Sequence, residues 1–260
     1  MIPRDLSRRR ALVTAAGVTA AAALGTTGVL STPALAAPGP VSPSPVPSGA
    51  APNSEELKEA LRRLEARRRR VLTGRHSENG WEMQKVVDAE GDIVTHSVPG
   101  TGLTVTARSG DVGTVLVHVI RRFHYEVDAL GLPGEPRPLE GWTKPSEVRD
   151  SRLPESNRAS GTAVVIRPGS YPAGARGGFD AAQLSVIRDI LADTEGVVRW
   201  GGDDRRPQEG LFSLVVRPGD PRLAQVAAKL RDWDRTPGLG AGTVADVNEP
   251  ARRRRAARFS

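Results

Sequence analysis

Short apolar runs, separated by glycine and proline, constrain what this chain can fold into between residues 80 and 235. Some runs alternate with a period of two, as in strands, and others recur every three or four residues, as in amphipathic helices. Strands are predicted at residues 103–107, 163–166, 197–200 and 211–216, and helices at residues 111–123, 180–193 and 221–233. Because strands and helices do not alternate regularly, the pattern predicts a small mixed α+β domain with a short antiparallel sheet and packed helices.

The predicted helix that begins at Asp111 carries a clear apolar stripe. Its members recur at helical spacing and are Val112, Val115, Leu116, Val119, Ile120 and Phe123. This spacing predicts that one face of the helix is buried. A long proline-rich loop is expected over residues 131–154, before the next strand.

The first 36 residues have the composition of an export signal. Three arginines at residues 8–10 precede an apolar stretch rich in Ala, Gly and Thr, and an Ala-Leu-Ala cleavage site follows at residues 34–36. This order is typical of a twin-arginine signal peptide. A membrane anchor is the alternative, but Ala, Thr and Gly gain little free energy in hydrocarbon, so no permanent membrane span is expected. The protein is therefore expected to be secreted, on the cell-wall side.

Two segments separate this signal from the domain. Residues 37–52 are rich in Pro and Ser and are predicted to be an extended linker. Residues 53–72 are predicted to form an amphipathic helix, opened by a capping box of Asn53 and Glu56 and ending in four arginines at residues 67–70.

The formal charge of +7 lies at the two ends of the chain. Residues 1–36 carry a net +3 and residues 248–260 a net +4, which leaves residues 37–247 neutral. This distribution argues against a nucleic-acid-binding face, and no specific nucleic acid partner is expected. The absence of cysteine excludes disulfides and thiol chemistry.

The basic C-terminal segment, residues 236–260, is predicted to be a disordered, solvated tail, because it offers little apolar surface for a core. A second interpretation gives it a function. In that case the arginine runs at residues 67–70 and 252–255 bind an anionic polymer, with an affinity that falls steeply as salt is added.

Three blocks of sequence carry a more specific signal. Residues 156–166 are Ser-Asn-Arg-Ala-Ser-Gly-Thr-Ala-Val-Val-Ile, residues 196–203 are Gly-Val-Val-Arg-Trp-Gly-Gly-Asp, and residues 208–212 are Gln-Glu-Gly-Leu-Phe. In order and separation they resemble the motif blocks of the zinc D-Ala-D-Ala carboxypeptidases and dipeptidases, peptidase family M15. The resemblance covers about residues 100–220 and implies the fold of that family.

The differences from the family pattern fall on the reactive positions. The resemblance places Arg158, Val165 and Leu211 where the family has its zinc ligands, and Gln208 where it has its general base. Arg cannot donate a lone pair, Val and Leu have none, and Gln cannot accept a proton as a base. No metal, no cofactor and no catalytic residue are therefore expected, and the resemblance implies a catalytically silent protein.

The remaining residues of the blocks suggest a binding groove for a peptidoglycan stem peptide. The candidate ligand-binding residues are Arg158, Ser156, Asp203, Trp200 and Glu209. Packing and turn formation are the alternative explanation for the glycines and for Trp200. The side chains at the three ligand positions are expected to surround one cleft, with Arg158 paired to Asp203 or Glu209.

Two enzymatic alternatives remain open, and the sequence leaves the oligomeric state undetermined. An active metallopeptidase would need zinc ligands at other positions, for which the histidines at 76, 96, 118 and 124 are the candidates. Glu209 could act as its general base if the alignment is shifted by one residue. A serine hydrolase built on Ser156 or Ser160 lacks a nucleophile elbow and an assignable histidine.

Removal of the signal segment can be tested by the intact mass of the secreted protein. We expect a mature chain that begins at Ala37, because residues 34–36 form a small-x-small cleavage site. A secreted or membrane-retained product that still begins at Met1 as its main species would contradict this expectation.

Overall fold

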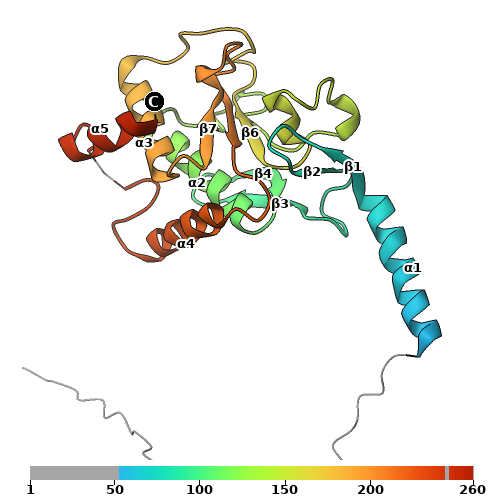
Figure 1. Ribbon diagram of the computed structural model, residues 1–260. Helices are drawn as coiled ribbons and strands as arrows, with labels where there is room; N and C mark the ends of the chain where they lie inside the picture. The colour runs from blue at the N-terminus through green and yellow to red at the C-terminus, as the bar shows by residue number, and fades with distance from the viewer. Residues whose placement is uncertain (1–52, 244–245, 260) are drawn as a thin grey trace, which may run out of the picture. The chain divides into compact units, whose positions relative to one another are not determined.

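The computed structural model describes residues 53–243 and 246–259 (Figure 1). All of them belong to one compact unit, Pro52–Ser260. The predicted signal peptide and linker, residues 1–36 and 37–52, lie outside the described residues. The predicted fold class is confirmed, because the unit combines helices with short antiparallel sheets.

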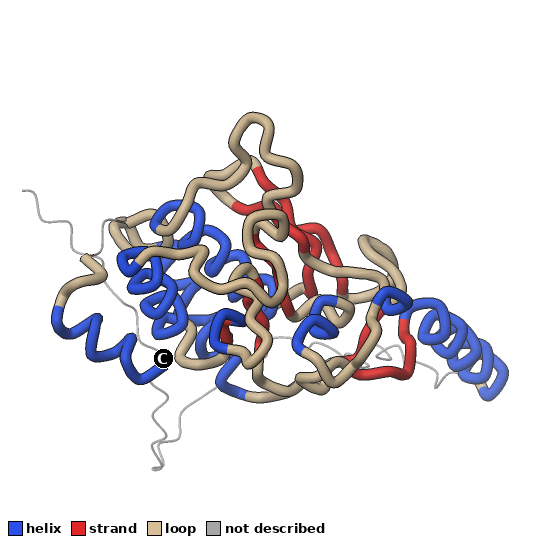
Figure 2. The backbone as a smooth tube through the Cα atoms, turned by 90° about the horizontal axis from the view of Figure 1, so that it is seen from above, coloured by secondary structure: helices blue, strands red, loops and turns tan. Residues whose placement is uncertain are grey.

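The helices are α1 (Ser54–Val71), α2 (Asp111–Glu126), α3 (Ala181–Asp193), α4 (Pro221–Arg235) and α5 (Pro250–Ala256). The strands are β1 (Leu72–His76), β2 (Glu82–Gln84), β3 (Ile93–Val98), β4 (Leu103–Arg108), β5 (Leu139–Glu140), β6 (Ala163–Ile166), β7 (Val198–Trp200) and β8 (Leu211–Leu214). Strands β5-β6-β8-β7 form one antiparallel sheet in that order, whereas β1 pairs with β2 and β3 with β4. Figure 2 shows the helices gathered beside the strands.

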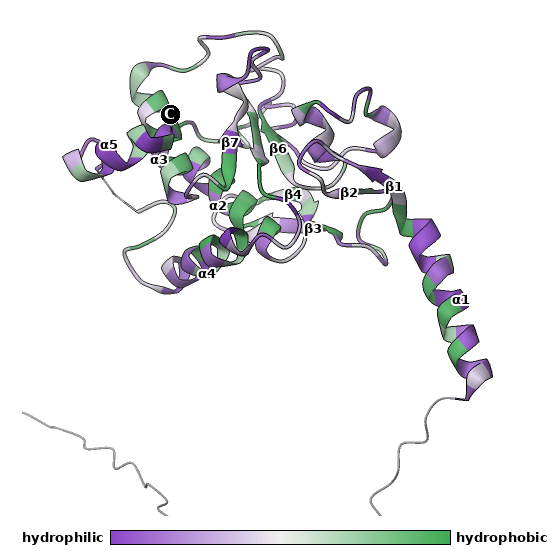
Figure 3. Cartoon of the chain, viewed as in Figure 1, coloured by the Kyte–Doolittle hydropathy of each residue, from purple (hydrophilic) through white to green (hydrophobic). Residues whose placement is uncertain are grey.

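The main core lies between α2 and one face of the four-stranded sheet. Every member of the predicted α2 stripe is buried, and Phe123, its last member, makes edge contacts with Phe179 and Phe212, with ring centroids 5.8 Å and 6.3 Å apart. Strand β6 has the colour of hydrophobic residues in Figure 3, and all of its residues are buried. One detail differs from the sequence prediction. Gly110, with a positive φ of 71°, occupies the N-cap, and Asp111 is the first residue of α2.

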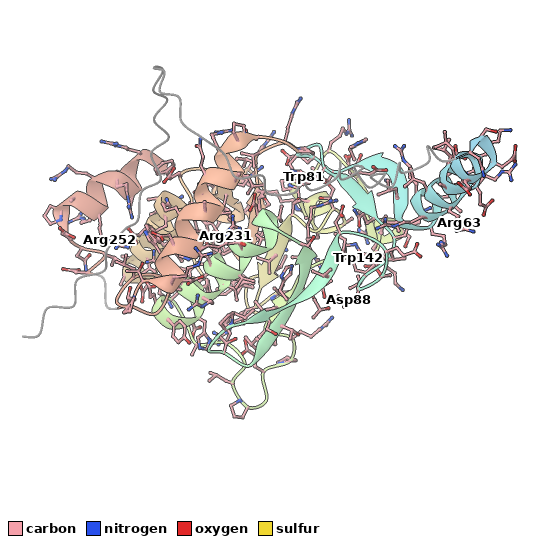
Figure 4. All side chains as sticks on the ribbon, turned by 90° about the horizontal axis from the view of Figure 1, so that it is seen from below. Arg63, Trp81, Asp88, Trp142, Arg231 and Arg252 are labelled. Atoms are coloured by element: carbon pink, nitrogen blue, oxygen red, sulfur yellow. The ribbon has the colours of Figure 1, made fainter. Side chains whose placement is uncertain are left out.

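The domain begins before residue 80, where the sequence placed its boundary, because β1 and β2 belong to it. Two indole groups hold β2 and the turn before it (Figure 4): Trp81 donates to the Val216 carbonyl at 2.7 Å, and Trp142 donates to the Gln84 carbonyl at 3.1 Å. The predicted loop 131–154 also contains an edge strand, since β5 pairs with β6. These strands are short and carry mixed polar residues, so their own sequence gives a weak signal.

The prediction of a disordered tail is wrong for residues 250–259, which are helical and packed. Helix α5 lies against α3, and Phe259 packs on the main core. Arg252 donates to Asp189 at 3.2 Å, and Arg255 donates to Asp193 at 2.5 Å. These partners could not be predicted from the sequence, because the two carboxylates lie more than 60 residues away on α3.

Asp189 and Asp193 form a buried ion cluster with Arg122 of α2. The two acids are only 1% and 3% exposed, and Arg122 donates to them at 2.9 Å and 2.5 Å. Burial alone would raise the pKa of Asp193, but the facing His118 ring and the charges of Arg122 and Arg255 lower it from 3.8 to about 2. Burial likewise opposes the charge of Arg122, yet its pKa is raised by Glu126 and the two aspartates.

Removing the two α5 arginines should weaken the fold. The double variant Arg252→Ala/Arg255→Ala takes two cations from nearly buried carboxylates, and we expect it to lower the free energy of unfolding by about 1–3 kcal/mol. The matched control is Arg253→Ala/Arg254→Ala, which removes the same charge from exposed side chains of the same helix. Urea unfolding measures both, and equal stability of the two double variants would contradict a structural role for the tail.

Because the pKa of Asp193 is low, the contribution of the cluster to the stability of the fold should depend on pH in the acid range. Its contribution to stability should be fully present above about pH 3.8 and lost as the pH falls through about 2, because the folded state binds the proton more weakly than the unfolded state. The Asp193→Asn variant should show a smaller loss of stability across this window. A carboxyl resonance of Asp193 that titrates near pH 4 in the folded protein would contradict the assignment.

Candidate functional site

The second face of the four-stranded sheet carries the positions singled out by the sequence. Val165 on β6 and Leu211 on β8 are direct register partners. Together with Ala163 they form a small buried apolar cluster, separate from the main core. Two of the three predicted ligand positions therefore touch, and they make a dry hydrocarbon contact in place of a polar one.

Arg158 lies at the same face of the sheet, where it forms an ion pair with Glu140. Glu140 on β5 is the register partner of Val165, so both side chains point to one side of the sheet. Arg158 ends the short 3₁₀ helix η2 (Pro154–Arg158), lies 3.1 Å from the Glu140 carboxylate and donates to the Gly141 carbonyl at 2.9 Å. Burial lowers the pKa of Arg158, and the negative charges of Glu140 and Glu147 oppose this shift.

The predicted pairing of Arg158 with Asp203 or Glu209 is wrong. Asp203 instead forms a two-pronged pair with Arg188 of α3, at 2.5 Å and 2.6 Å. Glu209 accepts hydrogen bonds from the backbone N–H groups of Gly177 and Gly178, at 2.9 Å and 2.8 Å. The true partner, Glu140, was missed because the sequence assigned its short edge strand to a loop.

The other candidate residues have internal partners. The hydroxyl of Ser156 is buried, accepts from the Glu78 N–H at 2.9 Å and donates to the Ser151 carbonyl at 3.0 Å. Trp200 donates to the Glu209 carbonyl at 2.6 Å, and the Arg188 guanidinium lies 5.1 Å from its ring. Ser156, Trp200 and Glu209 therefore hold the fold around the site.

Two glycines around the site permit a close backbone approach. A Cβ atom at Gly201 would lie 2.6 Å from the Gln208 carbonyl oxygen and 3.0 Å from Cβ of Leu211. At Gly178 it would lie 2.8 Å from a Glu209 carboxylate oxygen. Steric necessity is thus enough to explain these glycines.

A cleft opens beside β7 and β8, with Leu211 and Gln208 in its wall. It measures about 460 Å³ and is lined by Leu153, Pro154, Glu155, Arg199, Asp204, Arg205, Arg206, Gln208 and Leu211. Arg199 is paired with Asp204 and lies 3.8 Å from Glu78. Arg205 and Arg206 are exposed and have no ion-pair partner in the part of the chain that the structure describes.

The cleft therefore combines free cations with an apolar wall. Arg205 and Arg206 were not among the candidates predicted from the sequence. The Arg-Arg dipeptide that follows Asp203 and Asp204 was the available signal, but its lack of ion-pair partners among the described residues is visible only in the structure. Leu153 and Pro154 come from η2 and its N-cap, the same turn that ends at Arg158.

The histidines lie apart from the cleft. His118 is buried on α2, 3.8 Å from Asp193, and His124 accepts a hydrogen bond from the Leu130 N–H at 2.9 Å. Within residues 53–243 and 246–259, no group of three or more His, Cys, Asp or Glu side chains could hold a metal ion. In the same residues, no helix is long and apolar enough to cross a membrane.

The two arginine runs are largely tied to acids of their own chain. Arg67 donates to the Glu90 carbonyl and Arg70 to the Glu90 carboxylate, while Arg252 and Arg255 bind the α3 acids. Each run therefore presents fewer free charges than its sequence suggests.

Comparisons with known proteins find no match to this chain. No family model, no curated protein and no solved structure is similar to it. Its function must follow from the residues and contacts given above.

The buried Glu209 carboxylate should order the loop that precedes α3. In Glu209→Gln, one of the two accepting oxygens becomes an NH2 group that cannot accept an N–H and the charge is lost, so we expect a loss of about 1–3 kcal/mol of stability. Amide exchange at Gly177 and Gly178 should also accelerate. Glu155→Gln is the control, since Glu155 is exposed and lines the cleft; unchanged exchange in the Glu209 variant would contradict the role assigned to Glu209.

Proposed function

We propose that this chain is a secreted, catalytically silent protein with an M15-like fold that binds the carboxylate end of a cell-wall peptide in the cleft beside β7 and β8. The apolar contact of Val165 with Leu211 carries the proposal. It fills the place where the resembled family would hold two zinc ligands. Gln208, at the position of the general base, cannot accept a proton.

The chemistry of the cleft suits a short peptide that ends in small apolar residues. A guanidinium binds a carboxylate with two parallel hydrogen bonds, and Arg205 and Arg206 are free to do so. Leu153 and Pro154 supply apolar surface that can cover methyl groups, and the buried Leu211 lies behind them in the wall. A D-Ala-D-Ala terminus offers both a carboxylate and two methyl groups, so a peptidoglycan stem peptide is the proposed ligand.

Arg158 has a positioning role in this proposal. Its pairing with Glu140 closes the β5 side of the face and leaves it unavailable as the main carboxylate receptor. A partly buried arginine without its acid would be costly, so the pair stabilises the packing of η2 on the sheet.

Binding is tested by titrating a peptide that ends in D-Ala-D-Ala into the full-length chain. We expect Arg205→Ala/Arg206→Ala to weaken binding by at least about tenfold, since two charge-assisted contacts are lost. Arg253→Ala/Arg254→Ala is the matched control, with the same charge removed far from the cleft in sequence, and it should bind like the wild type. The same peptide with a C-terminal amide should bind weakly to every variant.

Three outcomes would overturn this proposal. Release of D-Ala in the presence of added zinc would favour an active metallopeptidase with displaced ligands. Equal binding by the two double variants would remove the cleft from any role. Binding that follows only the total number of arginines, and that prefers long polyanions to the peptide, would favour the anionic-polymer alternative.

A further inference from the structure

We propose that two copies of this chain associate through α1, side by side and antiparallel. Helix α1 exposes a stripe of three leucines, Leu57, Leu61 and Leu64, which are 51%, 50% and 59% exposed. Every residue from 54 to 70 is exposed, and only Val71 is buried. The stripe shows as green bands among the purple of α1 in Figure 3.

Contacts among the residues of α1 itself support the helix. Asn53 and Glu56 form a complete capping box, and Arg63 donates to Glu59 at 3.0 Å one turn earlier. Arg67 and Arg70 attach its C-terminal turn to Glu90. Arg63, labelled in Figure 4, shows how the polar side chains of α1 point outward along it. Helix α1 is therefore already formed, and its apolar stripe is exposed.

The spacing of the stripe is that of a coiled-coil seam. Positions 57, 61, 64, 68 and 71 follow one another at intervals of four and three residues, and four of them are apolar. The exception is Arg68. In a parallel pair Arg68 would face the partner's Arg68, whereas in an antiparallel pair it lies along the partner's Leu57 and covers it with its aliphatic stem.

The charges along α1 also favour the antiparallel arrangement. Three glutamates, at 55, 56 and 59, lie in its first half, and four arginines, at 67–70, end it. Reversing one copy sets Lys58 beside the partner's Glu65 at the edge of the stripe. Glu55 and Glu59 lie on the opposite face and pair within their own helix. Among the described residues, Arg68 and Arg69 have no ion-pair partner of their own.

A pocket at the base of α1 continues the stripe and offers a place for one partner side chain. It measures about 270 Å³, and its walls include Leu64, Arg68, Val71 and Leu72. In the antiparallel register that sets Leu61 against the partner's Leu64, the partner's Leu57 meets this pocket. The seam and the pocket thus form one continuous apolar surface.

A second copy explains this surface better than a lipid surface does. A helix that lies on an anionic membrane carries cations along its whole polar face. Here the first half of α1 is acidic, which an anionic surface would repel. The separation of charge into two halves fits a reversed copy of the same helix.

The oligomeric state of the full-length chain tests the proposal by sedimentation equilibrium. We expect a concentration-dependent dimer whose dissociation constant rises by more than about tenfold in Leu61→Glu, because a charge then replaces an apolar contact in both copies. Ala66→Glu is the matched control, with the same added charge on the opposite face of α1, and it should dimerise like the wild type. Helix content by circular dichroism should be unchanged in both variants, since neither residue is buried.

The orientation is tested by disulfide trapping, which is unambiguous because the chain has no cysteine. A mixture of Leu57→Cys and Arg68→Cys chains, carrying tags of different size, should cross-link mainly as the mixed species. Cross-linking of Arg68→Cys with itself would overturn the antiparallel arrangement. A monomer at all concentrations, or equal association of the Leu61 and Ala66 variants, would overturn the dimer itself, and binding of the monomer to anionic vesicles through the stripe would replace it with a membrane contact.

Discussion

The buried cluster of Arg122 with Asp189 and Asp193 is the interaction on which the arrangement of the helices depends. Unpaired, any of these charges would cost several kcal/mol in the interior, so α2, α3 and α5 must meet where the cluster forms. Arg122 supplies a single cation for two acids and Glu126, and the C-terminal arginines balance the remainder. The end of the chain is thereby part of the fold.

Helix α3, which carries both acids of this cluster, also positions the candidate cleft. Arg188 directly precedes Asp189 on α3, and it binds Asp203 in the turn after β7. This turn leads into Arg205 and Arg206, and Arg199 holds Asp204 behind them. The buried cluster therefore fixes α3 through Asp189 and Asp193, while Arg188 binds the loop that lines the cleft. A change in the contacts of α5 with α3 would therefore affect the cleft loop, which is bound to the same helix.

Features with a local periodicity were predictable from the sequence, and those that depend on distant partners were not. The α2 stripe and strand β4 follow from spacing, since burial of one face leaves its period in the sequence. Strands β6, β7 and β8 follow from short apolar runs, and the capping box of Asn53 and Glu56 follows from its residue types. The edge strand β5 has only two residues and shows no period. The partner of Arg158 depends on that strand, and the partners of Arg252 and Arg255 depend on how α5 meets α3, so these ion pairs could not be predicted. In the cleft, Leu211 and Gln208 were found from the motif blocks, but free arginines are recognised only once the paired ones are known.

Val165 and Leu211 contact each other, so the residue type at one of these positions restricts the residue type at the other. An aspartate at 165 facing Leu211 would be a buried, unpaired charge, and a histidine at 211 facing Val165 would be a buried polar group without a partner. A single polar side chain is therefore unstable at either position, whereas two apolar side chains stabilise the sheet. Under the proposed function, such a cleft would hold its ligand only through surface cations and methyl contacts, which would give modest affinity in salt. Two copies joined through α1 would present two such clefts at once, and a polymer with repeated peptide ends could then be held by both, with the second contact strengthened by its proximity to the first.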